Sequence, residues 1–143
     1  MGIPYYFSYI IKNYGNIIKK IQKKLSVDGF FLDSNSIIYD AIYNTEYSGN
    51  KESYEKEIIN YVCEKIKLYI QQVSPSTLVY IAFDGVAPVA KLDQQRSRRY
   101  KSWFQSRNKN QNGWDRTAIT PGTQFMVALN KGVEKYFKNN TKL

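Results

Sequence analysis

Two aspartates and a cluster of cationic side chains are the residues of this chain whose types and spacing suggest chemistry. Asp33 closes the apolar part of residues 29–35, and Asp84 closes the apolar part of residues 77–85. A densely basic segment follows, in which polar side chains recur at spacings of four, three and one: Lys91, Gln95, Arg98 and Arg99. Carboxylates that meet can hold a cation, and clustered cationic groups can hold a phosphate group.

The two aspartates are expected at the carboxyl ends of neighbouring parallel strands, where the loops of such a sheet bind ligands. Two carboxylates that lie close together in a buried setting repel each other, so they need a cation. The chain has no histidine and one cysteine, so we expect a hard, oxygen-preferring ion, Mg²⁺ or Mn²⁺. An alternative stays open at this point, in which each aspartate only caps a turn or a helix at its strand end.

The basic segment is predicted to form a helix from Val89 to Phe104. The spacing of its polar side chains places Lys91, Gln95, Arg98 and Arg99 on one face about 100° wide. Their many donors suit a phosphate group better than a base edge, although a merely solvated basic helix is the alternative. A different face is expected to pack on the sheet through Val89, Leu92, Tyr100, Trp103 and Phe104. Arg96 lies toward this apolar face, and the sequence gives no account of it.

The surrounding elements are read from the hydrophobic pattern. Residues 29–35 and 77–85 are predicted as buried strands, and residues 53–73 as an amphipathic helix between them. Strand, helix and strand in this order imply a right-handed crossover and a parallel sheet. A last helix is expected to start with Thr120 as its N-cap and Pro121 as its first residue. Its apolar face would carry Phe125, Met126, Leu129, Val133 and Phe137.

An earlier helix is predicted from the apolar stripe of Ile17, Ile18, Ile21 and Leu25. We interpret its lysines as a solvated face, with RNA contact as the alternative: Lys19, Lys20, Lys23 and Lys24. Residues 105–113 are expected to form a polar loop.

Composition limits the chemistry and the class of protein. Without histidine there is no Ser-His-Asp triad and no histidine-ligated zinc. Cys63 lies in the apolar pattern of the predicted helix 53–73, and we expect it to be a packed side chain. Residues 1–84 carry nine Lys and Arg against nine Asp and Glu, whereas residues 85–143 carry twelve against three. This one-sided positive charge favours a polyanionic partner. No apolar run is long enough for a membrane span, so we expect no membrane partner. The single cysteine favours a reducing, intracellular setting, and the length favours a single domain, residues 1–143.

Four blocks of the sequence resemble the N-terminal segment of the XRN-type 5′→3′ exoribonucleases. They read "MGIPYYFSYI", "FFLDSNSIIYDAI", "IAFDGVAPVAKLDQQRSRRYKS" and "ITPGTQFM", in the order and spacing of that family. The resemblance implies an α/β nuclease of the PIN/flap-endonuclease-like kind, with a parallel-sheet core, flanking helices and an incomplete fold. It also implies Mg²⁺-dependent degradation of RNA from a 5′-monophosphate end.

The resemblance also assigns roles to residues. Asp33 and Asp84 match the first two catalytic, metal-binding carboxylates, and Lys91, Gln95, Arg98 and Arg99 match the cramped pocket that holds the 5′-phosphate and rejects triphosphate or capped ends. Asn35 and Tyr39 would contact the substrate, with Tyr39 in place of a histidine that stacks on the first base. Ser36 replaces a glycine.

The family's remaining carboxylates, including a Gly-Glu-Gly-Glu-type motif, would follow the last helix seen here. We therefore expect the chain to be the opening part of a nuclease, which the remainder of the nuclease domain would complete. Two alternatives stay open: an RNA-binding remnant without catalysis, and a flap-type DNA nuclease. The compartment, cytoplasm or nucleus, and the source, cellular or viral, are also left open.

Overall fold

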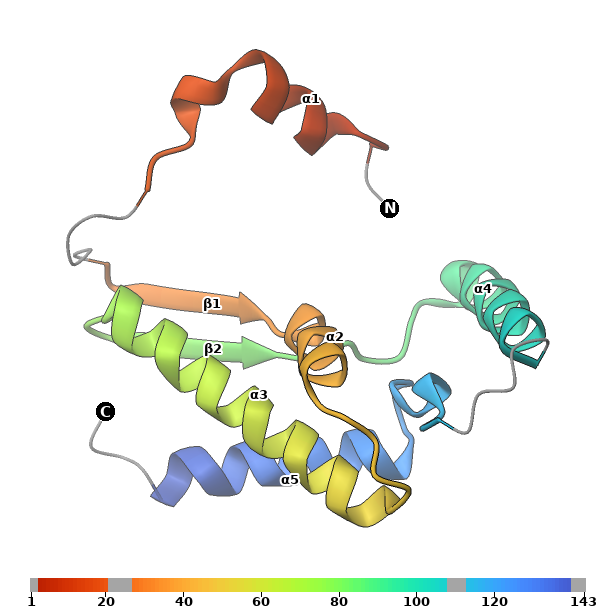
Figure 1. The fold of residues 1–143 in the computed structure, drawn as a ribbon. Helices are drawn as coiled ribbons and strands as arrows, with labels where there is room; N and C mark the ends of the chain where they lie inside the picture. Colours follow the sequence, from red (N-terminus) through yellow and green to blue (C-terminus); the bar gives the residue numbers. More distant parts are fainter. Residues whose placement is uncertain (1–2, 21–26, 108–112, 140–143) are drawn as a thin grey trace.

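The computed structural model describes residues 3–20, 27–107 and 113–139 (Figure 1). Its elements follow in chain order: α1 (Tyr6–Asn13), the 3₁₀ turn η1 (Gly15–Ile17), β1 (Gly29–Asp33), α2 (Asn35–Asn44), α3 (Lys51–Val73), β2 (Leu78–Ala82), α4 (Val89–Arg107), the 3₁₀ turn η2 (Arg116–Ala118) and α5 (Gln124–Asn139). The α/β class is confirmed. In the described ranges, no helix is both long enough and apolar enough to cross a lipid bilayer.

Strands β1 and β2 pair in parallel, as the order of elements predicts. Their register runs from Gly29 opposite Leu78 to Asp33 opposite Ala82. Because side chains alternate between the faces of a strand, Leu32 and Ile81 share one face, and both pack against the buried core.

The other face of this sheet carries Phe31 and Tyr80, whose rings lie 6.0 Å apart. Phe31 is 69% exposed and Tyr80 is 57% exposed. The prediction of fully buried strands is therefore wrong for one face. Both strands have a continuous apolar sequence, but the helices of the described chain cover the Leu32 and Ile81 face alone.

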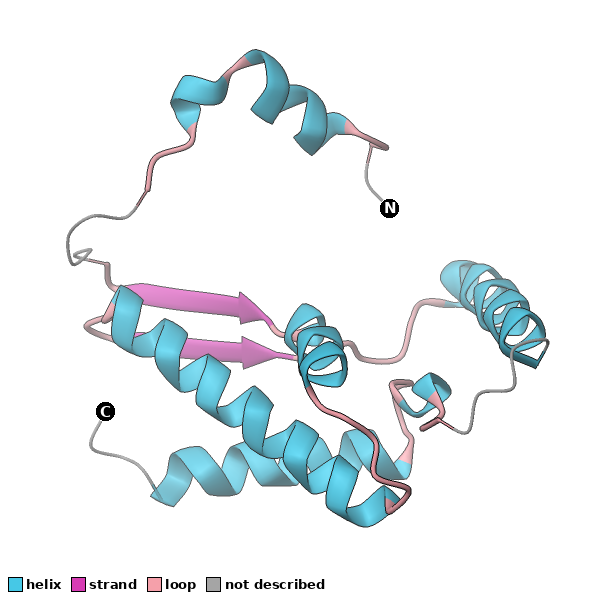
Figure 2. Cartoon of the chain, viewed as in Figure 1, coloured by secondary structure: helices cyan, strands magenta, loops and turns pink. Residues whose placement is uncertain are grey.

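The core lies between α2, α3 and α5 rather than in the sheet. Its completely buried side chains include Ile38 from α2, Ile58 and Ile66 from α3, and Leu129 from α5. Helix α3 confirms the predicted amphipathic helix, and its N-cap Asn50 accepts a hydrogen bond from the Ser53 amide at 3.1 Å. Figure 2 shows the three helices grouped beside the two strands.

Cys63 lies in this core with 1% of its surface exposed, which confirms that it is a packed side chain. Burial, together with the nearby Glu64 carboxylate, raises the pKa of its thiol to about 11. The thiolate form is therefore scarce near neutral pH, and Cys63 has the properties of a small apolar side chain.

The start of the last helix differs from the prediction. Residues 120–123 form a turn, in which the Thr123 amide donates to the carbonyl of Thr120 at 3.1 Å and Gly122 has a φ of 88°, and α5 begins only at Gln124. The positive φ of Gly122 interrupts the helical backbone that Thr120 and Pro121 would have started. Thr123 is next to the helix instead, and its hydroxyl accepts a hydrogen bond from the Met126 amide at 3.3 Å.

The N-terminal segment also departs from the prediction. A helix that the sequence pattern does not single out, α1, ends at Asn13, and η1 ends at Ile17. Ile18 has extended backbone angles, so the helix expected from the Ile17–Ile18 stripe does not continue there. The predicted positions Ile21, Lys23, Lys24 and Leu25 lie outside the described residues, as does most of the predicted loop at 105–113, while α4 itself extends to Arg107.

Helices α3 and α5 approach each other closely at Gly132. A Cβ atom built on Gly132 would lie 2.6 Å from Cγ2 of Ile59, which is attached directly to the branched Cβ of that side chain. Since a branch methyl cannot swing away as the end of a long side chain can, the contact leaves no room for a larger residue.

We expect Gly132→Ala to lower the free energy of unfolding. Overpacking of this kind costs about 1–3 kcal/mol, which exceeds the gain of about 1 kcal/mol from the better helix propensity of alanine. Thermal unfolding followed by circular dichroism measures the difference. Ile59→Leu removes the methyl in conflict, so adding it to Gly132→Ala should recover part of the loss. A single Gly132→Ala variant more stable than the parent would contradict the close packing of α3 and α5.

Candidate functional site

The two predicted aspartates lie at the same edge of the sheet. Asp33 is the last residue of β1, and Asp84 comes two residues after the end of β2. The ladder continues past Asp33, because the amide of Ser34 donates to the carbonyl of Ala82 at 2.8 Å. Both carboxylates are exposed to solvent, whereas Ser34 between the strands and α2 is completely buried.

Asn35 ties this edge together by two reciprocal hydrogen bonds with Asp84. Its side-chain amide Nδ2 donates to Oδ2 of Asp84 at 2.9 Å, and its Oδ1 accepts from the Asp84 backbone amide at 2.9 Å. The two residues are 49 positions apart in the chain. Asn35 therefore orients the Asp84 carboxylate, a role that sequence reasoning missed. Its predicted contact with substrate stays a prediction.

Tyr39 lies one turn after Asn35 on α2, so both side chains belong to the same face of that helix. The ring of Tyr39 is 52% exposed. An aromatic surface is thus open to solvent near the edge that carries the carboxylates, which agrees with the stacking role expected of this residue without testing it.

The donors at this edge are of the type that Mg²⁺ and Mn²⁺ prefer, namely carboxylate and amide oxygens. Among the described residues there is no group of three or more His, Cys, Asp or Glu side chains placed to hold a metal ion. A pair of aspartates suits a single ion that keeps much of its water shell rather than a two-metal centre.

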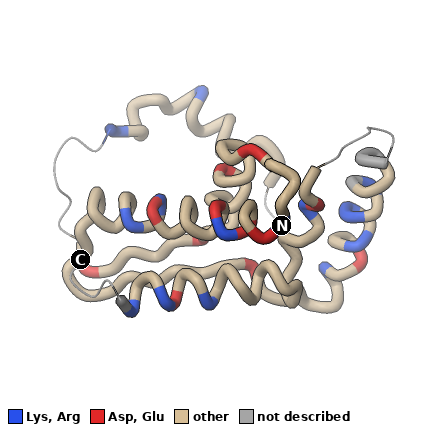
Figure 3. Tube along the Cα trace, turned by 60° about the horizontal axis from the view of Figure 1, so that its bottom comes forward, with Lys and Arg blue, Asp and Glu red and all other residues tan. Residues whose placement is uncertain are grey.

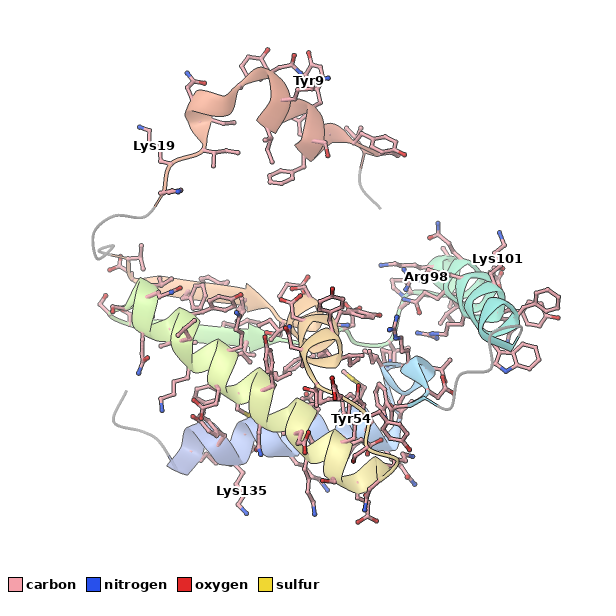
Figure 4. The ribbon with its side chains drawn as sticks, in the orientation of Figure 1. Tyr9, Lys19, Tyr54, Arg98, Lys101 and Lys135 are labelled. Carbon is pink, nitrogen blue, oxygen red and sulfur yellow. The ribbon has the colours of Figure 1, made fainter. Side chains whose placement is uncertain are left out.

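All four residues predicted to bind phosphate lie on α4: Lys91, Gln95, Arg98 and Arg99. The helix predicted from Val89 to Phe104 is confirmed. Because the backbone is helical throughout, the four residues lie on one side of α4. Gln95 and Arg99 are half-buried, while Lys91 and Arg98 are exposed. Figure 4 shows Arg98 on the side of α4 nearer the rest of the chain and Lys101 on the side farther from it.

Helix α4 does not pack on the sheet as expected. Figure 1 shows it beyond the carboxyl ends of the strands, joined to them by the extended residues 83–88. Its apolar side chains remain accessible: Val89 is 83% exposed, Tyr100 64% and Phe104 56%. The physical reason is the connection itself, because residues 85–88 carry the chain out from the sheet edge before the helix begins.

The connection is nevertheless short. Five residue steps separate Asp84 from Val89, the first residue of α4, which limits the two Cα atoms to about 18 Å. The first residue of α4 therefore lies within about 18 Å of the carboxylate edge, and the cationic side chains follow it along the helix.

Charge is concentrated on the same helix. Residues 89–107 contain six Lys and Arg but a single acidic residue, Asp93. Figure 3 shows α4 with several basic positions and one acidic position, whereas α3 carries acidic and basic positions close together. Mixed charges are typical of a solvated helix face, but the one-sided charge of α4 produces a positive field suited to a polyanion.

Comparison with known proteins agrees with the resemblance read from the sequence. The family model described as XRN 5′-3′ exonuclease N-terminus matches residues 1–143. The chain belongs to this family. Family membership places the fold among the PIN-like nucleases, which the parallel α/β arrangement bears out.

The curated relatives are much longer than this chain. It is 33% identical over 151 residues to 5′-3′ exoribonuclease 1 of Saccharomyces cerevisiae, an alignment that covers 96% of the chain and 10% of the relative. It is 28% identical to 5′-3′ exoribonuclease 1 of Homo sapiens, covering 97% and 9%, and 27% identical to 5′-3′ exoribonuclease 2 of Schizosaccharomyces pombe, covering 97% and 18%. The chain thus spans about a tenth to a fifth of the relatives it matches.

We expect Asn35→Ala to lower the free energy of unfolding by about 1 kcal/mol, because two solvent-exposed hydrogen bonds to Asp84 are lost. Asn35→Asp should cost more at pH 7 than at pH 4, since it sets a second carboxylate against Asp84 and only acid neutralises the pair. Urea unfolding at the two pH values measures both effects.

The matched control is Ser36→Ala, which changes an exposed neighbour on the same helix and should shift stability by less than about 0.5 kcal/mol. If Asn35→Asp were as stable at pH 7 as at pH 4, relative to the parent chain, the pairing of Asn35 with Asp84 would be refuted.

Proposed function

We propose that this chain is the N-terminal part of the catalytic domain of a 5′→3′ exoribonuclease that hydrolyses RNA from a 5′-monophosphate end. The observation that carries the proposal is the adjacency of two structures: a carboxylate edge, where Asn35 orients Asp84, and a cationic helix that begins five residues later. Membership of the family, and the names of the curated relatives, support the nuclease class and an RNA substrate.

Each part of this arrangement would have its own task. Asp33 and Asp84 would hold Mg²⁺ or Mn²⁺, with Asn35 fixing the direction of the second carboxylate. When bound, the ion would supply an activated water and neutralise charge on the scissile phosphate. Lys91, Arg98 and Arg99 would bind the terminal phosphate as a dianion, and Gln95 would add an amide donor.

Binding of the 5′-phosphate would also set the register of the cut. A strand whose end is fixed on α4 can present a phosphodiester to the carboxylate edge, while the exposed ring of Tyr39 offers a surface for the first base. A triphosphate or a cap is bulkier than a monophosphate, so a cramped pocket of the kind that the resemblance implies would exclude it.

A second candidate function is RNA binding without hydrolysis by residues 1–143 themselves. It is favoured by one observation, the lack of a third acidic side chain near Asp33 and Asp84 within the described part of the chain. In the longer proteins of this family, further carboxylates supplied by the remainder of the domain would complete the metal site, and we propose that remainder as the natural partner of this segment.

We expect the chain to bind single-stranded RNA with a 5′-monophosphate about tenfold more tightly than the same RNA with a 5′-hydroxyl or a 5′-triphosphate, because charged hydrogen bonds to a fitted phosphate contribute about 1.5–3 kcal/mol. Fluorescence anisotropy at fixed salt measures the three affinities. Arg98→Ala should abolish the preference, whereas Lys101→Ala removes the same charge from α4 outside the proposed phosphate face and should keep it. Equal affinity for all three ends would defeat the proposal.

Cleavage assays separate the two candidate functions. Degradation of 5′-monophosphorylated RNA that requires Mg²⁺ or Mn²⁺ and is lost in Asp84→Asn would rule out the non-catalytic function. Retained binding without turnover at high Mn²⁺ would instead favour it for these residues.

A further inference from the structure

A groove of about 630 Å³ lies between α4 and η2, on a different side of α4 from most of the predicted phosphate-binding residues. The side chains that matter here are Asp93, Arg96, Arg99, Tyr100 and Trp103 from α4 and Thr117 from η2. The helical spacing by itself gives Arg96 no role, and the structure places this residue in the wall of the groove.

The helical spacing separates the two sides of α4. Arg96, Tyr100 and Trp103 are spaced four and three apart, so they share a side, and that side is turned about 140° from Lys91. Arg99 lies between the two sides and lines the groove as well. One helix therefore presents two different surfaces that share Arg99.

The groove combines the two chemical features that a nucleotide requires. The rings of Tyr100 and Trp103 are 64% and 44% exposed, and their centroids lie 5.9 Å apart with 36° between the planes. Such rings offer stacking surfaces to an unpaired base of any sequence. The guanidinium groups of Arg96 and Arg99 offer several donors to a phosphate oxygen.

The wall opposite α4 is fixed in place. The amide and hydroxyl of Thr117 both donate to the carboxylate of Asp115, at 2.8 and 2.6 Å. Trp114, the residue before Asp115, donates from Nε1 to Glu55 of α3 at 3.0 Å, and its ring meets that of Phe125 of α5 edge to face. Thr117 is thereby fixed relative to α3 and α5. One wall of the groove is thus attached to the helical core, and α4 forms the other wall.

We propose that this groove is a second RNA-binding site, which holds an unpaired nucleotide of a single-stranded RNA. Its base lies against Trp103 and Tyr100, its phosphate lies at Arg96 and Arg99, and the Asp93 carboxylate accepts from a base amino group. The volume is within the range of small-molecule sites, about 300–1,000 Å³. The inference rests on the proposed function in taking RNA as the nucleic acid, but it does not depend on the 5′-phosphate.

Charge complementarity favours a nucleic acid over an apolar polypeptide as the occupant. Residues 89–107 carry six basic side chains against one acidic side chain. In the part of the chain that the structure describes, no ion pair joins Arg96 or Arg99 to Asp93. An apolar segment seated in the groove would bury two guanidinium groups against the single carboxylate of Asp93, which is costly, whereas a phosphate supplies a further anion.

Single-stranded RNA ten nucleotides long with a 5′-hydroxyl end is the probe, because it lacks the group that the other side of α4 is proposed to bind. Trp103→Ala should weaken its binding about 5- to 100-fold, the range for loss of one stacked base. Trp103→Phe keeps a ring and should bind within about threefold of the parent. Arg96→Gln should weaken binding more than Lys101→Ala, which removes the same charge outside the groove.

Photocrosslinking locates the contact directly. RNA carrying 5-bromouridine should form an adduct within residues 102–107, the tryptic peptide that contains Trp103, and excess unlabelled RNA should suppress it. Single-stranded DNA of the same sequence is the second arm, and tighter binding of DNA than of RNA would overturn the choice of RNA. Circular dichroism of every variant verifies that the helices are intact.

Two results would overturn the groove site even if the 5′-monophosphate preference were confirmed. One is unchanged affinity of folded Trp103→Ala and Arg96→Gln for the 5′-hydroxyl probe. The other concerns iodide quenching of the Trp103 fluorescence in the absence of RNA. Quenching that becomes weaker as the protein concentration rises would mean that a polypeptide, not RNA, covers the groove. Conversely, the parent chain could bind all three 5′ ends equally while Trp103→Ala and Arg96→Gln weaken binding of the 5′-hydroxyl probe. That result would support the groove site and contradict the phosphate face.

Discussion

Parallel pairing of β1 and β2 is the constraint on which the rest of the structure depends. Leu32 and Ile81 lie opposite each other in register and both pack on the core, so a slip of β1 by one residue would turn Leu32 to solvent and Phe31 inward. The same register sets Asp33 opposite Ala82 and lets Asn35 reach Asp84 across 49 positions of sequence. The positions of the groups at the carboxylate edge are thus set by the apolar packing of the strand residues just before it.

Stability and chemistry are located in different parts of the molecule. The buried side chains belong to α2, α3 and α5, while the carboxylates and the basic helix α4 lie at the edge of this core and beyond it. Separation of this kind leaves α4 accessible on two sides. It also leaves one face of the sheet exposed, in a chain that spans a tenth to a fifth of its curated relatives.

The strands, the crossover helix α3 and the basic helix could be predicted from the sequence, because each has a clear apolar period or a dense charge pattern. Helix α2 was missed, since its residues follow a strand without any loop signal, and the start of α5 was misplaced because the effect of Gly122 on the backbone outweighed the signal of Thr120 and Pro121. For the candidate site, the sequence identified the acidic and cationic side chains. It did not predict the hydrogen bonds of Asn35, which join residues distant in the chain, or the place of Arg96.

What the sequence determined by itself is local: two apolar runs that end in aspartate, a helix with cationic side chains on one side, and the motifs that mark the family. Spacing along a helix is a property of the backbone, so the common side of Lys91, Gln95, Arg98 and Arg99 needed no tertiary information. Tertiary structure alone decided that α4 stands away from the sheet, that Asn35 orients Asp84, and that Arg96 faces Thr117 across a groove. These outcomes depend on where the short connection at residues 83–88 directs the chain and on which segments the helical core brings together, and neither is encoded in the pattern of any single element.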